Sequence, residues 1–169
     1  MTSSARPEPH WEIAFGTWRT HKEQSEAAQL LLCRLIGFKV TIEHTEKGAP
    51  FIPELPNLYI SISHCRTAVA VAACEGRRVG IDIESRRKVS PSLIERVCTS
   101  DETATIQSSD DLTMAFLRLW TRKEAVLKMR GTGIQGFGSM VEALKTTDCT
   151  VTELDCRQND TVAALATAL

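Results

Sequence analysis

Residues 119–134, LWTRKEAVLKMRGTGI, contain the most regular pattern in the sequence. They extend an apolar stripe whose members recur at steps of three, four or seven residues, as one buried helix face requires. The members of the stripe are Leu112, Ala115, Phe116, Leu119, Val126 and Leu127. Glu124 and Lys128 are four residues apart and share a neighbouring face. The pattern predicts a long helix that begins at residues 110–111 (Asp-Asp) and ends at the glycine-rich loop from Gly131.

A second pattern lies upstream, in residues 78–84 (RVGIDIE). It alternates with the period of two that a strand requires, so Asp82 and Glu84 point to the same face. Neighbouring carboxylates repel each other, and a hard cation such as Mg²⁺, usually shared with substrate phosphates, relieves that repulsion. Glu124 could complete the set of ligands from the helix. Without a cation, Glu124 and Lys128 would be an ordinary surface pair, worth a few tenths of a kcal/mol.

The composition is typical of one folded domain. The 169 residues carry a formal net charge of -1, which gives no indication of nucleic-acid or anionic-membrane binding. No apolar run is long enough to span a bilayer, and no signal peptide is found. The six cysteines show no metal-ligand spacing. We therefore expect a single domain over residues 1–169 in a reduced, cytoplasmic location, with residues 1–9 disordered.

The remaining segments predict both helices and strands. Helices are expected over residues 20–36 and 91–98, and after a cap at Ser100 or Asp101. Strands are expected over residues 10–18 (ended by Gly16), 38–44, 59–63, 68–74, 77–84, 139–145, 150–157 and 161–168. Residues 68–74 are apolar on both faces, which favours a central strand, and residues 59–84 are expected to form an antiparallel meander. Residues 45–57 are expected to form an extended, proline-rich loop.

Three blocks of the sequence together resemble the phosphopantetheinyl transferase family, in its surfactin-synthetase-activating type. They are residues 48–53 followed by LYISISH (58–64), then VGIDIE (79–84), and then LWTRKEAVLK (119–128). Any one block alone would be a weak signal, but the three stand in the same order and spacing as in that family. The resemblance covers residues 48–133 well. It implies an α+β fold of antiparallel sheets with packed helices, in two pseudo-repeated lobes at about 10–75 and 76–169. It also favours a final strand over residues 161–168, where an alanine-rich helix is the alternative.

The resemblance further implies the site residues. It assigns Mg²⁺, with Mn²⁺ as an alternative, to Asp82, Glu84 and Glu124. It assigns coenzyme A contacts to Gly48, Pro50, Ser63, His64, Lys123 and Lys128. Lys128 could also return a proton to the leaving group or orient the nucleophile. The general base could be Glu102, Glu124 or a metal-bound water, and Glu102 could equally be a favourable charge at a helix N-terminus.

The reaction implied by the resemblance is transfer of 4'-phosphopantetheine from coenzyme A to a serine of an apo acyl or peptidyl carrier protein. Adenosine 3',5'-bisphosphate would be released. Positioning and electrostatics supply most of the catalysis in such phosphoryl transfers. The basic run at residues 86–88 could steer these anionic partners or be ordinary surface. Two alternatives are a non-catalytic module that binds coenzyme A or a carrier protein, and a magnesium-dependent nucleotide phosphohydrolase. The sequence does not indicate which carrier is used or whether acyl-coenzyme A is tolerated.

The N-terminal part departs from the pattern of the family. The first lobe is expected to be short of an opening strand or two, and a second subunit in a homo-oligomer could complete it. Ala49 stands where the family has a lysine. Residues 27–32 lack the arginine that the family places there for the ribose phosphate, and Arg19, Lys22 or Arg34 could substitute for it.

Overall fold

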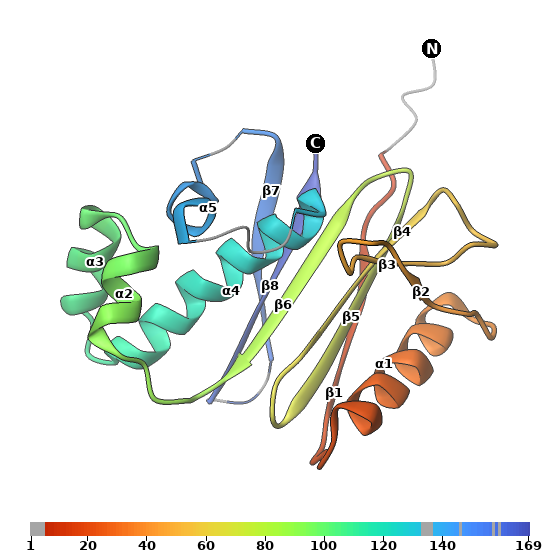
Figure 1. Cartoon of the computed structure of the whole chain (residues 1–169), viewed down its shortest axis with the longest axis horizontal. Helices are drawn as coiled ribbons and strands as arrows, with labels where there is room; N and C mark the ends of the chain where they lie inside the picture. The colour runs from red at the N-terminus through yellow and green to blue at the C-terminus, as the bar shows by residue number, and fades with distance from the viewer. Residues whose placement is uncertain (1–5, 133–136, 146, 157, 159) are drawn as a thin grey trace.

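The computed structural model describes residues 6–132, 137–145, 147–156, 158 and 160–169. Within them, the chain forms two three-stranded antiparallel sheets, each covered by a long helix (Figure 1). The first sheet has α1 (His21–Ile36) beside it and contains β1 (His10–Phe15), β4 (Leu58–His64) and β5 (Ala68–Glu75). The second has α4 (Leu112–Arg130) beside it and contains β6 (Val79–Ser85), β7 (Cys149–Leu154) and β8 (Thr161–Ala168). The prediction of a mixed α+β fold with antiparallel sheets is confirmed.

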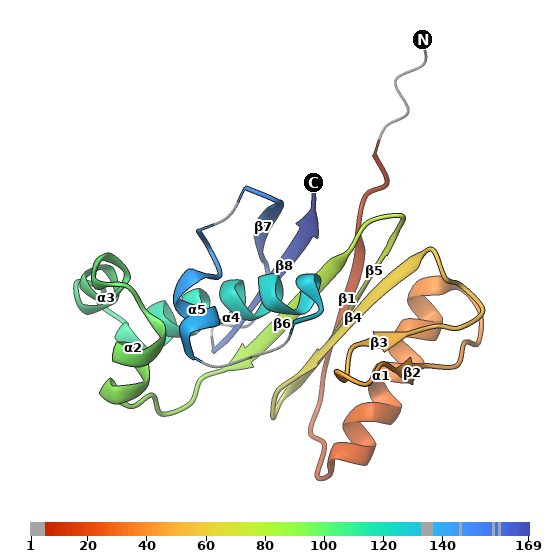
Figure 2. The ribbon, with the colours of Figure 1, turned by 45° about the horizontal axis from the view of Figure 1, so that its top comes forward.

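Shorter elements connect these parts. β2 (Glu43–His44) pairs with β3 (Pro50–Phe51), and this pair lies beside β4 (Figure 2). Three short helices of the described chain flank α4, and they are α2 (Pro91–Val97), α3 (Ser100–Gln107) and α5 (Phe137–Glu142). None of the helices within the described ranges has the length and hydropathy needed to cross a membrane.

The two sheets have the same strand order. The first runs β1-β5-β4 and the second runs β6-β8-β7, so in each sheet the strand that comes last in the sequence lies in the middle. In each, the long helix follows the first strand and precedes the second strand along the chain. The central place of β5 agrees with the prediction from its apolar composition.

The helices begin and end where their capping residues require. Thr20 and Glu23 form a reciprocal capping box at the start of α1, with Glu23 N–H donating to Thr20 Oγ1 at 3.2 Å. Asp111 caps α4 by accepting a hydrogen bond from Met114 N–H at 3.1 Å. Gly131 ends α4 with a left-handed φ of 68°. The predicted start and end of the central helix are confirmed.

The sheets form the inner layers of the molecule and the long helices form the outer ones. Val69 and Val71 of β5 pack in one core cluster with Leu32 of α1. The opposite face of the first sheet packs on the second sheet through Ala68, Ala70, Ala72, Val79, Ile81 and Ile83. On the far side of the second sheet, Ala164 packs against Ala125 of α4. Alternate residues of β6 therefore face the first sheet and α4.

Gly80 allows β6 to lie unusually close to α4. A Cβ atom at this position would overlap the carbonyl oxygen of Ala125 and the amide nitrogen of Met129. Only a residue without a side chain permits such an approach of strand and helix backbones. The carboxylates that follow on the same face of β6, Asp82 and Glu84, are consequently held against the helix.

Three predictions about local structure are wrong. Residues 38–44 form a strand only at 43–44, because Gln29 Nε2 donates to the Val40 carbonyl at 2.6 Å and replaces a strand partner. Residues 139–145 hold the end of α5 and not a strand, since Met140 and Ala143 are buried at a helical spacing of three. Thr99, and neither Ser100 nor Asp101, caps α3.

The meander is also incomplete. Among the described strands, β4 pairs with β5 as expected, but β6 pairs with β8. Pro7, placed in the segment expected to be disordered, accepts a hydrogen bond from Arg77 at 3.2 Å. Residues 1–5, residues 133–136 of the predicted glycine-rich loop, and Arg157, which ends one predicted strand, lie outside the described residues.

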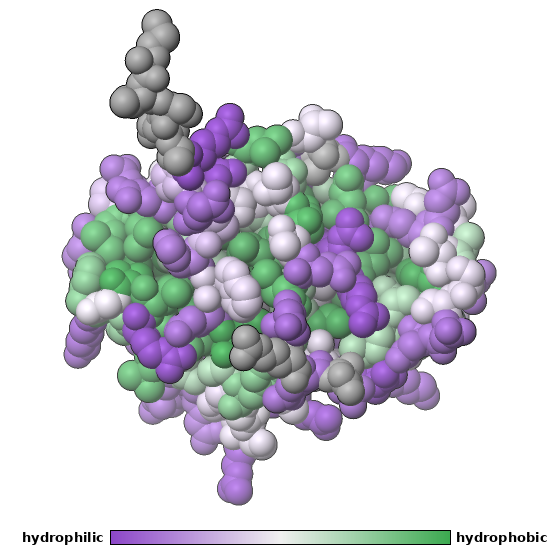
Figure 3. All heavy atoms as spheres, turned by 180° about the vertical axis from the view of Figure 1, so that it is seen from behind, coloured by the Kyte–Doolittle hydropathy of each residue, from purple (hydrophilic) through white to green (hydrophobic). Residues whose placement is uncertain are grey.

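Most of the large apolar side chains that remain exposed belong to residues 10–75. Among the described residues of that segment they are Trp11, Phe15, Leu30, Phe38, Phe51 and Tyr59. Leu30 is 72% exposed and Phe38 is 56% exposed. Seen from behind, the surface shows apolar patches among the hydrophilic side chains (Figure 3).

Candidate active site

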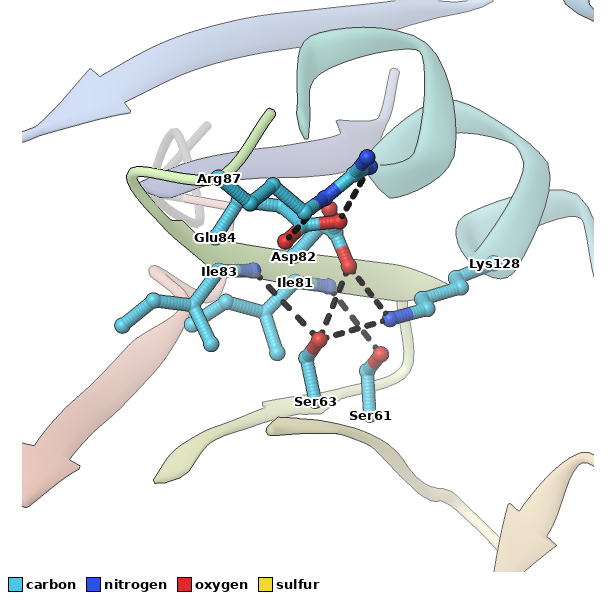
Figure 4. A network of polar contacts seen from close by, with 8 residues as sticks. All are labelled: Ser61, Ser63, Ile81, Asp82, Ile83, Glu84, Arg87 and Lys128. Atoms are coloured by element: carbon cyan, nitrogen blue, oxygen red, sulfur yellow. Dashed lines mark hydrogen bonds and ion pairs between the residues drawn. The ribbon is translucent and has the colours of Figure 1, made fainter. Parts of the chain in front are cut away.

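Three elements bring polar side chains together around Asp82 of β6 (Figure 4). Asp82 Oδ1 accepts hydrogen bonds from Ser63 Oγ of β4 at 2.8 Å and from Lys128 Nζ of α4 at 2.7 Å. Lys128 Nζ also donates to Ser63 Oγ at 2.9 Å. Asp82 is 5% exposed, so this ion pair is poorly screened by solvent. The predicted residues Asp82, Ser63 and Lys128 are therefore in direct contact.

Two serines of β4 hold the two sheets in register at this site. Ser61 Oγ accepts from the backbone N–H of Ile81 at 3.0 Å, and Ser63 Oγ accepts from that of Ile83 at 3.4 Å (Figure 4). These N–H groups lie on the edge of β6 that does not pair with β8. Buried backbone donors need a partner, and the serine hydroxyls supply it.

One oxygen of Asp82 is left without a partner. Among the buried side-chain oxygen and nitrogen atoms in the described part of the chain, Asp82 Oδ2 is the one without a hydrogen-bond partner. Leaving a buried carboxylate oxygen unsatisfied is unfavourable, because its lost hydration is not replaced. A bound cation would replace that hydration, so the observation fits the predicted metal ligand.

Glu124 lies on α4 and is 8% exposed. Burial, and then the negative charge of Asp82, raise the pKa of Glu124 to about 7; Lys128 opposes this shift and Glu84 adds to it. Glu84 itself pairs with Arg87 at 3.1 Å. The three predicted carboxylates thus share one electrostatic environment. However, the described residues contain no group of three side chains already arranged to hold a metal ion.

A cleft opens beside Lys128, between the loop before β4 and the end of α4. A cavity of about 160 Å³ is lined by Lys128 together with Gly48 and Pro50, the two loop residues predicted to contact coenzyme A. A larger cavity of about 800 Å³ shares Pro50 and Lys128 and extends past Arg78 and Arg130. Ligand sites are typically about 300–1,000 Å³. The structure therefore brings Gly48, Pro50 and Lys128 to one concave surface.

His64 ends β4, one residue after Ser63. Its ring meets the ring of His21 edge-on, with the ring centres 5.1 Å apart. Burial, and then the nearby His21 and Lys128, lower the pKa of His64 below its usual 6.5. His64 is therefore mostly uncharged at neutral pH, and an imidazole N–H remains available as a hydrogen-bond donor.

Comparison with known proteins identifies the family. Residues 78–165 match the 4'-phosphopantetheinyl transferase superfamily. This chain belongs to that superfamily. The 4'-phosphopantetheinyl transferase Sfp of Bacillus subtilis (strain 168) is 33% identical over 91 residues, which are 53% of this chain and 40% of the relative. The 4'-phosphopantetheinyl transferase AcpT of Escherichia coli (strain K12) is 32% identical over 135 residues, 77% of this chain and 69% of the relative. The match to Sfp thus spans well under two thirds of that relative's length.

In this member of the superfamily, Lys123 lies away from the cleft. It is 0% exposed, seven residues after Phe116 on the buried stripe of α4. Its Nζ donates to the Val97 carbonyl and to Glu102 Oε2, each at 2.7 Å. Glu102 also accepts from Thr99 N–H at 2.8 Å and so caps α3. In this arrangement Lys123 and Glu102 join α4 to α2 and α3, and neither side chain lines the two cavities described above.

Lys123→Met is expected to destabilise the fold by about 3 kcal/mol, because it leaves a carboxylate and a carbonyl without their buried cation. Urea unfolding followed by circular dichroism would measure this. Lys145→Met is the matched control, since Lys145 forms an exposed pair with Glu142 at 2.9 Å and should change stability by less than about 0.5 kcal/mol. Unchanged stability in Lys123→Met would contradict the buried role and favour the predicted phosphate contact.

The sequence did not indicate three residues of this candidate site, which are Ser61, Arg78 and Arg130. Ser61 could have been found, since it lies two residues before Ser63 and so on the same strand face. Arg78 and Arg130 had no local signal, because the cavity that they line forms only when β6 and the end of α4 come together.

Proposed function

We propose that this chain transfers 4'-phosphopantetheine from coenzyme A to a serine hydroxyl of an apo acyl or peptidyl carrier protein, releasing adenosine 3',5'-bisphosphate. The observation that carries the proposal is the partly buried Asp82–Lys128 pair beside a cleft lined by Gly48 and Pro50. A charged group next to a mostly apolar cavity suits a ligand that joins phosphates to an adenine ring. The similarity to the 4'-phosphopantetheinyl transferases Sfp and AcpT supports the same reaction.

We propose that Asp82, Glu84 and Glu124 hold Mg²⁺, or Mn²⁺ in its place. The unpartnered Asp82 Oδ2 and the raised pKa of Glu124 support these oxygen ligands. Glu84 would have to exchange its present partner, Arg87, for the metal. When bound, the cation would neutralise negative charge on the pyrophosphate oxygens.

The other residues position the substrates. Lys128 donates to the phosphates from a place fixed by Asp82 and Ser63, and neutral His64 donates from the end of β4. The serine oxygen bonds to the phosphorus on the pantetheine side while the bond to the adenosine bisphosphate half breaks. The serine proton goes to a general base. Of the two candidate carboxylates, Glu124 lies beside Asp82 and Lys128, whereas Glu102 is bonded to Lys123 away from the cleft.

We further propose two pseudo-repeated lobes, at about 10–75 and 76–169, which the shared strand order supports. A cytoplasmic location, a shortened first lobe and a homo-oligomer remain predictions. The alternatives also remain: a binding module that needs no clustered carboxylates, and a phosphohydrolase that uses water as the acceptor.

Intact mass of an apo carrier protein tests the proposal, after incubation with this chain, coenzyme A and Mg²⁺. We expect a gain of one phosphopantetheine that is lost with a chelator and with a carrier whose acceptor serine is replaced by alanine. Hydrolysis of coenzyme A without a gain in carrier mass would favour the phosphohydrolase. Binding of coenzyme A by calorimetry without either reaction would favour the binding module.

A further inference from the structure

Two large apolar side chains are exposed at the C-terminal half of α1 and just beyond it. Leu30 is 72% exposed, and Phe38, which follows the end of the helix, is 56% exposed. Together with Cys33 and Gly37 they line a surface cavity of about 700 Å³. The opposite face of α1 packs on the first sheet, so this cavity lies on the outer side of the helix. Large apolar side chains gathered around one hollow are typical of a surface that binds another protein.

Charged residues of opposite sign lie on the two sides of Leu30. Glu26 comes four residues before Leu30 and Arg34 comes four residues after it. In a helix each is therefore turned by about 40° from Leu30, one in each direction, so all three share one face. The side chain of Glu26 is 63% exposed and that of Arg34 is 66% exposed.

Both charged groups can take a further partner. Within the described chain, Glu26 pairs with Lys22 only at 3.8 Å, across one turn of exposed helix. Arg34 donates to both oxygens of Glu12, at 3.1 and 2.9 Å, and it does so with Nε. The two Nη groups of Arg34 are thus available to a second carboxylate.

This face of α1 is complementary to itself. Where two copies of the helix pack antiparallel about a two-fold axis at Leu30, residues at equal distances before and after Leu30 face each other. Glu26 then faces Arg34 of the partner subunit, and the same contact forms a second time across the axis. Lys22 comes eight residues before Leu30 and Phe38 eight residues after it, so an ammonium group also faces an aromatic ring. A parallel arrangement would instead place like charges together.

We propose that this chain forms a dimer through the outer face of α1, with the two helices antiparallel and the Leu30 side chains at the two-fold axis. The proposal goes beyond the transfer reaction and does not depend on it. A second copy suits this face better than an acidic carrier protein does, because the carrier would meet the carboxylates of Glu23 and Glu26. A contact between two helices of 16 residues, each about 24 Å long, forms a small interface. We therefore expect a dissociation constant of about 10 µM.

Sedimentation velocity between about 2 and 200 µM tests the proposal. The wild type should change from a monomer of 18.7 kDa to a species of twice that mass as its concentration rises. Leu30→Lys should remain monomeric throughout, because two like charges would meet at the axis. Lys145→Glu is the matched control, since Lys145 is an exposed residue outside α1 that pairs with Glu142, and it should keep the wild-type dissociation constant.

Glu26→Arg and Arg34→Glu test the direction and register of the pairing. Each variant alone would place like charges against each other and should raise the dissociation constant at least about tenfold. In an equimolar mixture of the two variants, every arginine at these positions would face a glutamate of the other chain. A heterodimer should therefore form with about the affinity of the wild type. Thermal unfolding of each variant would verify that it is folded.

Three results would overturn the inference. The first is a wild type that stays monomeric at about 200 µM. The second is a wild-type dimer that Leu30→Lys does not weaken, which would place the interface elsewhere on the molecule. The third is a mixture of the two charge variants that associates no more tightly than each variant alone, which would reject the antiparallel register. None of these measurements uses transfer activity, so a failure of the proposed function would be seen separately, in the carrier-mass assay.

Discussion

Gly80→Ala is expected to destabilise the fold by about 3 kcal/mol or more, a large part of the stability of an ordinary domain. The new methyl group would overlap the backbone of Ala125 and Met129, and backbone cannot move aside as a flexible side chain can. β6 and α4 would have to separate, and with them Asp82 and Glu124. Thermal and urea unfolding should show the loss of stability, and transfer activity should fall with it.

Gly138→Ala is the control for this prediction. Gly138 lies in α5, and a Cβ atom there would meet no atom within 4 Å. Alanine is the better helix former by up to about 1 kcal/mol, so this variant should be as stable as the wild type or slightly more stable. Equal unfolding midpoints for Gly80→Ala and Gly138→Ala would contradict the close packing of β6 on α4.

Glu124→Gln is expected to reduce transfer by about a hundredfold or more, because it removes a charged ligand next to Asp82. The same substitution should increase the stability of the metal-free protein at neutral pH. The folded-state pKa of about 7 lies above the ordinary 4.5, so the metal-free folded state binds this proton more tightly than the unfolded state does. Wild-type stability should therefore fall as the pH rises from about 4.5 to 7, by about 2 kcal/mol. Glutamine should abolish this loss.

Urea unfolding between pH 5 and pH 8, in chelator and then in Mg²⁺, would measure both effects. Above pH 7 without metal, Glu124→Gln should be more stable than the wild type, and Mg²⁺ should stabilise the wild type alone. Glu142→Gln is the control, since Glu142 is an exposed residue of α5 that pairs with Lys145. Wild-type transfer by Glu124→Gln, or equal stabilisation of both proteins by Mg²⁺, would reject the metal assignment.

Local pattern was sufficient to predict the elements with strong periodicity. The long stripe of α4 and its caps at Asp111 and Gly131 are encoded within a few turns of helix. Residues 139–145 are too short for such a pattern, and their helix depends on burying Met140 against α2 and α4. The pairing of β6 with β8 joins segments some eighty residues apart, which no local pattern contains.

In the candidate site, too, some features follow from local sequence pattern and others depend on contacts between distant segments. The alternation of β6 predicted that Asp82 and Glu84 share one strand face, and the spacing of Glu124 and Lys128 predicted that they share one helix face, because both follow from the backbone period. The burial of Lys123 depends on Glu102 and Val97, and these come from helices whose docking was not predictable from sequence. The resemblance to the transferase family supplied the chemistry, but it contained no information on Arg78 and Arg130.

The serine contacts of β4 also affect how this protein avoids aggregation. A strand edge with unpaired N–H groups is a template on which a strand of another molecule can add. Ser61 and Ser63 occupy the N–H groups of Ile81 and Ile83 without extending the ladder, so the two sheets meet there without forming one continuous sheet. The edge of β6 is thereby closed to intermolecular pairing at Ile81 and Ile83, and the same hydrogen bonds join the two sheets.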